Sequence, residues 1–77
     1  MHVLVLGGYG LIGLAVSKFL LDQGNQVTGL ARSAKTGRKF LPEASWISED
    51  ISKLTEPEDW FEILKNIDAV VNAAGIL

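Results

Sequence analysis

The sequence predicts an α/β fold, a doubly wound parallel sheet whose four strands lie in the order 3-2-1-4. Two observations lead to this prediction. Short apolar runs alternate with stretches of helical periodicity, and a glycine-rich segment joins the first run to the first helix. Such alternation is typical of parallel sheets that are covered by helices on both faces. A chain of 77 residues has room for one domain only.

The first thirty residues predict a strand, a helix and a second strand. Residues 2–6 are an unbroken apolar run, as expected of a strand buried on both faces. Apolar residues then recur at spacings of one, three and four over residues 11–23, which predicts a helix with one apolar, packed face. The residues of that face are Leu11, Ile12, Ala15, Val16, Phe19 and Leu20. Gly24 stands where a helix C-terminus favours a left-handed residue, and residues 26–31 form the next apolar run. Two parallel strands joined through a helix make a βαβ unit.

The second half of the chain predicts two more strands, over residues 45–49 and 69–74. Residues 32–43 are polar and basic, with weak helical character at most. A further helix is expected to be capped by Thr55 and to extend to about Asn66, because proline and glutamate follow at positions that suit a first turn.

Composition excludes several classes of protein. The hydrophobic share of 48% is too high for a disordered chain, and the net charge is −2. Without cysteine and with one histidine, the chain offers no disulfide and no zinc site built from these residues, so no metal is predicted and a cytoplasmic location is expected. Residues 3–16 resemble the core of a secretion signal, but Met1-His2 supplies no firm positive charge and the glycines are spaced for a turn. A strand followed by a turn is therefore the favoured interpretation. No apolar run approaches the roughly 18 residues of a membrane span.

Residues 7–13, Gly-Gly-Tyr-Gly-Leu-Ile-Gly, fit both G-x-G-x-x-G and G-x-x-G-x-x-G. A glycine turn between a strand and a helix presents backbone N–H groups and the positive end of a helix dipole, which suits a phosphate. We expect Gly10 to let the backbone approach a pyrophosphate and Gly13 to let the helix pack closely on the sheet. A tight turn without ligand is the alternative, and the second strand at the right distance argues against it. No lysine followed by serine or threonine closes the turn, which excludes a Walker ATP loop. The predicted dinucleotide contacts in this segment are Gly7, Gly8, Tyr9, Gly10, Leu11, Ile12 and Gly13.

The end of the second strand distinguishes between two cofactors. An NAD site usually has an acidic residue here, about 20 residues beyond the glycines, which binds the ribose 2′-hydroxyl. This chain has Ala31-Arg32-Ser33 instead, and the planar, permanently charged guanidinium of Arg32 suits a 2′-phosphate. The sequence therefore favours NADP(H) over NAD(H), with Ala31, Arg32, Ser33 and Lys35 as expected contacts.

Four of the seven basic residues fall within eight positions, 32–39. For Lys35, Arg38 and Lys39 a solvated loop and a role near the phosphate stand equally open. Nucleic-acid binding is not favoured, because the rest of the chain is acidic and the basic residues have no aromatic residues interleaved among them.

Two later strand ends complete the predicted site. A carboxylate at Asp50 could accept from the adenine amino group with Ile51 against the ring, or it could be an ordinary turn aspartate. The small residues Ala73, Ala74 and Gly75 leave room for the nicotinamide half of a dinucleotide. Asn72 lies in a run that should be buried, so its amide is expected to bind neighbouring backbone, with lining of the cofactor channel as the alternative.

These segments together resemble the start of a short-chain dehydrogenase/reductase, whose form of the glycine motif is G-x-x-G-x-x-G. The most similar branch is the extended or atypical one, with nucleotide-sugar epimerases and dehydratases and relatives of a respiratory complex I accessory subunit. The resemblance covers essentially all 77 residues but only about the first third of such a protein. It implies an N-terminal, partial NAD(P)-binding Rossmann domain over residues 1–77. In that family the residues corresponding to Asp50-Ile51 contact adenine, and those corresponding to Ala73 and Ala74 pass close to the cofactor.

Two departures from the family pattern bear on function. Many extended members have an acidic residue where Ala31 or Arg32 stands, which again favours NADP(H). The family's catalytic Tyr-x-x-x-Lys pair is absent, because Tyr9 is followed four residues later by Gly13, so no catalytic residue is assigned. We expect the dinucleotide-binding part of an oxidoreductase or epimerase that acts on a small molecule. The alternative is a non-catalytic NAD(P)-binding sensor or assembly subunit. The run at residues 69–74 would be a central strand of the complete fold, so the 77 residues are expected to be part of a longer chain.

Overall fold

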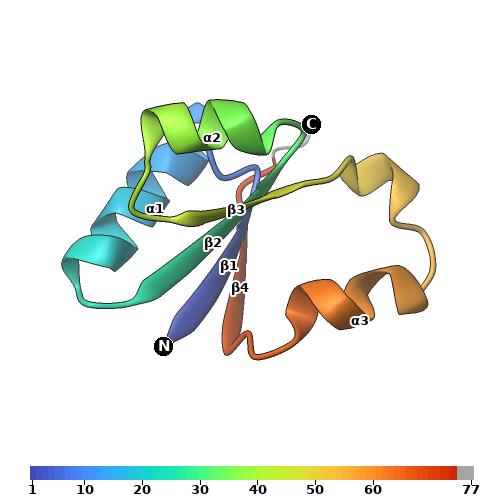
Figure 1. Ribbon diagram of the computed structural model, residues 1–77. Coiled ribbons are helices and arrows are strands. Elements are labelled where there is room, and N and C mark those ends of the chain that lie inside the picture. Colours follow the sequence, from blue (N-terminus) through green and yellow to red (C-terminus); the bar gives the residue numbers. More distant parts are fainter. Residues whose placement is uncertain (75–77) are drawn as a thin grey trace.

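The computed structural model describes residues 1–74 and contains a parallel sheet in the order β3-β2-β1-β4 (Figure 1). The strands are β1 (His2–Leu6), β2 (Gln26–Ala31), β3 (Ser45–Ser48) and β4 (Ala69–Asn72). The helices are α1 (Leu11–Asp22), α2 (Ala34–Phe40) and α3 (Glu58–Leu64), with a 3-10 turn η1 (Ile51–Lys53) after β3. The predicted fold class and strand order are confirmed.

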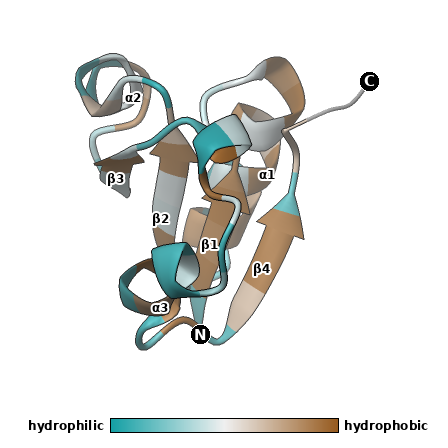
Figure 2. Ribbon diagram, turned by 90° about the vertical axis from the view of Figure 1, so that its right-hand side faces the viewer, coloured by the Kyte–Doolittle hydropathy of each residue, from teal (hydrophilic) through white to brown (hydrophobic). Residues whose placement is uncertain are grey.

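The helices form two layers around the sheet. Helices α1 and α2 cover one face, and α3 lies over the other (Figures 1 and 2). Neighbouring strands are in register, so that Leu4 of β1 is opposite Thr28 and Val70. Because successive side chains point to opposite faces, Val5 packs with the apolar cluster beneath α1 while Leu4 faces the α3 side. Both side chains are completely buried, so the centre of the sheet is covered from both sides.

Helix α1 packs through its smallest residues rather than its largest. Gly13 and Ser17 are its buried positions, whereas Leu11, Ile12 and Phe19 are 92, 68 and 62% exposed. The prediction that these three belong to the packed face is wrong. The apolar periodicity is real, but the two small residues four positions apart let the helix lie close to the sheet, and their line sets the buried face.

Helix α2 is a regular helix where the sequence indicated weak helical character at most. The Ser33 hydroxyl oxygen caps it by accepting the Thr36 N–H at 3.2 Å. Its buried residues, Ala34 and Gly37, are small enough for the helix to pack on β3 and β2. Tertiary packing and the cap therefore outweigh the low helix propensity of glycine and threonine in this segment.

Helix α3 begins at Glu58, so the expected cap at Thr55 is wrong. The Asp59 carboxylate accepts the Glu56 N–H at 3.0 Å instead, and this bond fixes the turn that precedes the helix. Strands β3 and β4 end at Ser48 and Asn72, before the predicted residues. Within residues 1–74, no helix has the length and apolar character to span a membrane.

Candidate dinucleotide site

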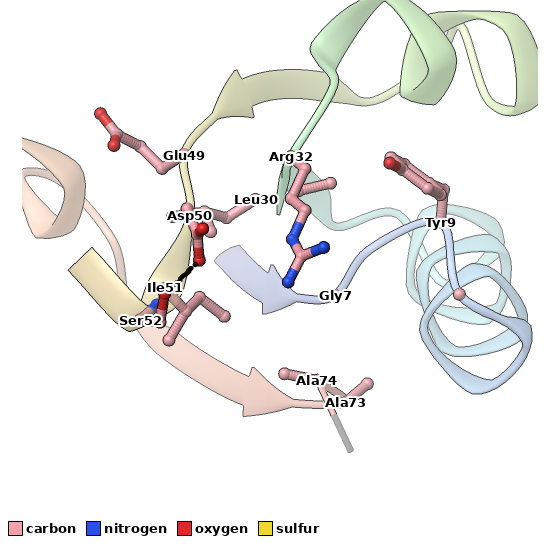
Figure 3. A pocket seen from close by; sticks show the side chains of 12 residues that line it. Gly7, Tyr9, Leu30, Arg32, Glu49, Asp50, Ile51, Ser52, Ala73 and Ala74 are labelled. Carbon is pink, nitrogen blue, oxygen red and sulfur yellow. Dashed lines mark hydrogen bonds between the residues drawn. The ribbon is translucent and has the colours of Figure 1, made fainter. Parts of the chain in front are cut away.

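The carboxyl ends of all four strands meet at one edge of the sheet, where the segments that follow them enclose a cleft of about 390 Å³ (Figure 3). Its volume is in the range of small-molecule sites. In doubly wound folds the ligand binds beyond the carboxyl ends of the strands. The lining residues are Gly7, Tyr9, Gly10, Leu30, Ala31, Arg32, Glu49, Asp50, Ile51, Ser52, Ala73 and Ala74.

The glycine turn leaves β1 at Gly7, whose φ of 74° lies in the left-handed region that favours glycine. Its N–H donates to the Leu30 carbonyl at 2.9 Å, which ties the turn to β2. A side chain at Gly7 would lie 2.8 Å from the Ala74 Cα, so the turn and the segment after β4 can approach each other only because the residue is glycine. At Gly13 a methyl group would collide with the Gly7 carbonyl oxygen, as expected from its predicted packing role.

Helix α1 presents an uncapped N-terminus to this edge. Its N-cap is Gly10, which has no side chain to accept a hydrogen bond, and its first turn contains no acidic residue. The Leu14 N–H donates to the Gly10 carbonyl at 2.8 Å. The first N–H groups of a helix have no intrahelical acceptor, and the helix dipole gives this end partial positive charge. This arrangement therefore suits an anion such as a pyrophosphate.

Arg32 follows the last residue of β2 directly and is exposed. Its guanidinium points into the cleft, with Asp50 on one side and Tyr9 on the other (Figure 3). Among the cleft-lining residues it is the one cation. The acidic groups of the cleft, Glu49 and Asp50, come from the end of β3 rather than from the end of β2.

Asp50 is held by the turn that it caps. Its Oδ1 accepts the Ser52 hydroxyl at 2.7 Å and the Ser52 N–H at 3.0 Å. The hydroxyl bond, then the N–H bond, and more weakly the charges of Arg32 and Lys53 lower the pKa of Asp50 below its ordinary value of 3.8. The group is therefore a carboxylate at neutral pH, and both bonds to Ser52 engage Oδ1 rather than Oδ2.

The end of β4 forms the remaining wall. The Ala73 N–H donates to the Leu6 carbonyl at 3.0 Å, which keeps the chain beside β1 for one residue after the strand. Asn72 is exposed rather than buried, but its Oδ1 accepts the Ala74 N–H at 3.1 Å, so the expected bond to neighbouring backbone is confirmed. Gly75 lies outside the described residues.

The cleft brings together nine of the sixteen residues that the sequence singled out. Gly8, Leu11, Ile12, Gly13, Ser33 and Lys35 do not line it. Gly8, in the turn, and Gly13, in α1, are buried, and Ser33 caps α2. Sequence reasoning missed Leu30, Glu49 and Ser52. Glu49 and Ser52 flank the predicted pair Asp50-Ile51, so including one residue on either side of that pair would have found them.

Comparison with known proteins places this geometry in a family. Residues 3–77 match the NAD dependent epimerase/dehydratase family. The chain is 40% identical over 76 residues to Photosystem II assembly factor Ycf39 of Synechocystis sp., covering 96% of this chain and 22% of that protein.

Solved structures show the same fold. A short chain dehydrogenase/reductase family protein superposes with a TM-score of 0.84 at 28% identity. The match covers 99% of this chain and 34% of the chain of that protein. UDP-N-acetylglucosamine 4-epimerase from Bacillus cereus gives a TM-score of 0.74 at 26% identity, covering 99% of this chain and 24% of its own. The chain thus spans about a third or less of each of these proteins. The uncapped helix end, the glycine turn and the matching family agree, and this chain belongs to the NAD-dependent epimerase/dehydratase family.

Proposed function

We propose that residues 1–77 are the dinucleotide-binding part of an NAD(P)-dependent protein and that they bind NADP(H) in preference to NAD(H). The observation that carries the preference is Arg32, a cation that points into the cleft from the end of β2. A guanidinium offers a planar set of donors to a 2′-phosphate. The carboxylate that would accept from a 2′-hydroxyl is not found at residues 31–33.

In the proposed complex each cleft wall contacts a different part of the ligand. The pyrophosphate lies at Gly10 and the N-terminus of α1. Asp50 accepts from the adenine amino group, and Ile51 packs against the ring. Ala73 and Ala74 lie beside the ribose and nicotinamide, where small side chains leave space for them. The family resemblance and the cleft lining support these assignments.

Titration with NADP⁺ and NAD⁺ tests the preference. Arg32→Ala is expected to weaken NADP⁺ binding by about tenfold or more, because a hydrogen bond to a charged group contributes roughly 1.5–3 kcal/mol. Binding of NAD⁺ should change little. Arg38→Ala is a matched control, since Arg38 is exposed on α2 and does not line the cleft. Equal affinities for the two dinucleotides, unchanged by Arg32→Ala, would contradict the preference.

The reaction is proposed from the family. The whole protein would be an oxidoreductase or epimerase in which hydride passes between the nicotinamide ring and a small-molecule substrate. In residues 1–77 we assign binding and orientation and no catalytic group. Turnover of reduced dinucleotide by the longer protein, with nucleotide sugars among the trial substrates, is the measurement that tests it.

A second function is favoured by the likeness to Photosystem II assembly factor Ycf39. On this alternative the protein binds a dinucleotide without turnover, as a sensor or an assembly subunit. The longer protein should then bind NADP⁺ and lack an active-site tyrosine and lysine four residues apart. Binding together with turnover would favour the enzyme.

A cytoplasmic location is the last part of the proposal. The absence of cysteine from the sequence fits a reducing compartment. Fractionation of cells that express the tagged longer protein tests it, and recovery from a membrane or organelle fraction would contradict it.

A further inference from the structure

Trp46 occupies a socket that is formed by glycines from three separate segments. Its indole meets Gly8 of the turn after β1, Gly29 of β2 and Gly37 of α2. A methyl group at Gly8 would lie 2.8 Å from the indole Cζ3, and one at Gly29 or Gly37 would overlap the ring. The indole Nε1–H donates to the Leu41 carbonyl at 2.9 Å, so the ring is held at its polar end as well.

The socket connects two parts of the proposed dinucleotide site. Gly8 belongs to the turn that we assign to the pyrophosphate, whereas Gly37 is in α2, the helix that begins two residues after Arg32. The next residue of the turn, Tyr9, also packs here, with its ring centroid 6.1 Å from that of Trp46 and 6.2 Å from that of Phe40. Trp46 itself does not line the cleft.

We propose that Trp46 is a positioning residue for dinucleotide binding, which fixes the phosphate-binding turn relative to the Arg32 end of β2 and to α2. The inference rests on the proposed function. One ligand must engage both the turn and Arg32, and a binding site needs its groups held within about 0.5 Å of the productive geometry. A rigid ring packed on bare backbone provides that constraint, because the glycines leave no side chain that could shift.

The far edge of the indole identifies the informative substitution. Gly8 and Gly29 meet the Cζ3 and Cη2 atoms of the six-membered ring, whereas Gly37 meets Cε3 and the two atoms where the rings fuse. The shorter side chain of Trp46→Phe would withdraw from Gly8 and Gly29 and would leave a gap between the turn and β2. The expected loss is therefore in the position of the turn.

Trp60 is the matched control. It is the only other tryptophan, it is also half-buried, and its Nε1–H donates to the Leu54 carbonyl at 3.1 Å. It lies in α3, where the described glycines do not meet it. Affinity for NADP⁺ is compared at a temperature at which circular dichroism shows every variant folded, so a purely structural role would leave the dissociation constant unchanged.

Trp46→Phe is expected to raise the dissociation constant for NADP⁺ by about three- to tenfold, and Trp60→Phe by less than about twofold. Equal effects of the two substitutions would overturn the inference and leave the proposed function standing. Failure of the unsubstituted protein to bind either dinucleotide would overturn both.

Fluorescence gives a second measurement, which also serves if Trp46→Phe fails to fold. The Trp60→Phe protein retains Trp46 as its one tryptophan, so its emission is expected to change as NADP⁺ saturates the site. Emission of Trp60 in the Trp46→Phe protein should stay constant. An unchanged Trp46 emission at saturating NADP⁺ would show that the turn and the indole are not coupled, and would overturn the inference.

Discussion

At the scale of single residues, the glycines of the turn have different roles. Gly7 and Gly13 leave no space for a Cβ, whereas the nearest atom to a Cβ on Gly10 would be the Gly7 carbonyl oxygen at 3.4 Å. The Gly10 φ of −66° is open to any residue. Gly10→Ala is therefore expected to change the melting temperature little and to weaken NADP⁺ binding by about tenfold or more, because the methyl group occupies the approach to the helix N-terminus.

Gly24 is expected to behave in the opposite way to Gly10 when stability and NADP⁺ affinity are measured. It follows α1 with a φ of 88°, and a Cβ at this position would meet nothing within 4 Å beyond its chain neighbours. Gly24→Ala should lower the free energy of unfolding by about 1 kcal/mol, through backbone strain alone. Affinity for NADP⁺ should stay unchanged, because this end of α1 is remote from the cleft. A Gly10→Ala protein that binds normally would contradict the role assigned to the turn.

Asp50 gives a prediction about pH. The Ser52 hydroxyl and N–H stabilise the carboxylate and lower its pKa in the folded state, below the ordinary 3.8. A lowered folded-state pKa contributes stability that is fully present above the ordinary value and is lost as the pH falls through the folded one. Ser52→Ala removes the largest cause, so it should raise the pKa of Asp50 toward 3.8 in a titration followed by NMR. An unchanged titration would show that the Ser52 hydroxyl does not determine the pKa.

At the scale of elements, the sequence predicts well where periodicity and turn chemistry agree. The apolar pattern and the glycines at element ends are enough to predict the first three elements. These are the strand over residues 2–6, the helix from Leu11 and the strand over residues 26–31. Helix α2 could not be predicted, because it depends on the Ser33 cap and on packing against Trp46. The start of α3 was misplaced for a similar reason. It is decided by the hydrogen bond from the Glu56 N–H to the Asp59 carboxylate, three residues later.

In the site, too, some residues could be predicted from the sequence pattern, whereas others depend on contacts between distant segments. The residues at strand ends were predictable, because parallel strands bring their carboxyl ends to one edge. Glu49 and Ser52 could have been included on the same ground, but the hydrogen bonds of Ser52 to Asp50 could not be predicted, since they depend on how the chain bends into η1. The part played by Gly8 also lies outside sequence reasoning, because it is explained by the indole of a residue 38 positions later.

Ser33 joins an element to the site, which makes its substitution informative. Ser33→Ala removes the cap of α2 and should lower the free energy of unfolding by about 0.5–2 kcal/mol. Ser33→Asp keeps a capping oxygen and should retain most of that stability. The added negative charge beside Arg32 should nevertheless weaken NADP⁺ binding more than NAD⁺ binding. Chemical denaturation and dinucleotide titration of both variants separate the two effects, and equal losses for NADP⁺ and NAD⁺ would contradict the placement of the 2′-phosphate.

At the scale of the whole molecule, the two faces of the sheet are covered unequally. The side of α1 and α2 holds the apolar cluster of the core. Helix α3 lies over the other side (Figure 2), where Phe61, Leu64 and Val70 are 65, 41 and 48% exposed. A chain of about this size buries only about 60% of the surface of its unfolded state. The stability of the 77 residues should therefore be small and should depend strongly on a few central side chains and on ligand.

Leu4 and the dinucleotide test this dependence together. Leu4→Ala should cost about 2–5 kcal/mol, because the side chain is fully buried at the centre of the sheet. Phe61→Ala, at an exposed position, should cost about 0.5 kcal/mol or less. A ligand that binds only the folded state adds about 2.7 kcal/mol at a concentration of about 100 times its dissociation constant. NADP⁺ should therefore raise the melting temperature of the unsubstituted protein by about 10–20 °C and recover part of the loss in Leu4→Ala.

The recovery connects the fold to its function, because the proposed ligand binds at the ends of the strands whose centre Leu4 stabilises. Arg32→Ala measured in parallel should melt near the temperature of the unsubstituted protein without ligand, because Arg32 is exposed, and should show a smaller upward shift with NADP⁺. With NAD⁺ the two proteins should shift alike. A rise in melting temperature that is the same for NADP⁺ with and without Arg32 would place the 2′-phosphate elsewhere, while no rise with either dinucleotide would remove the cleft as the binding site.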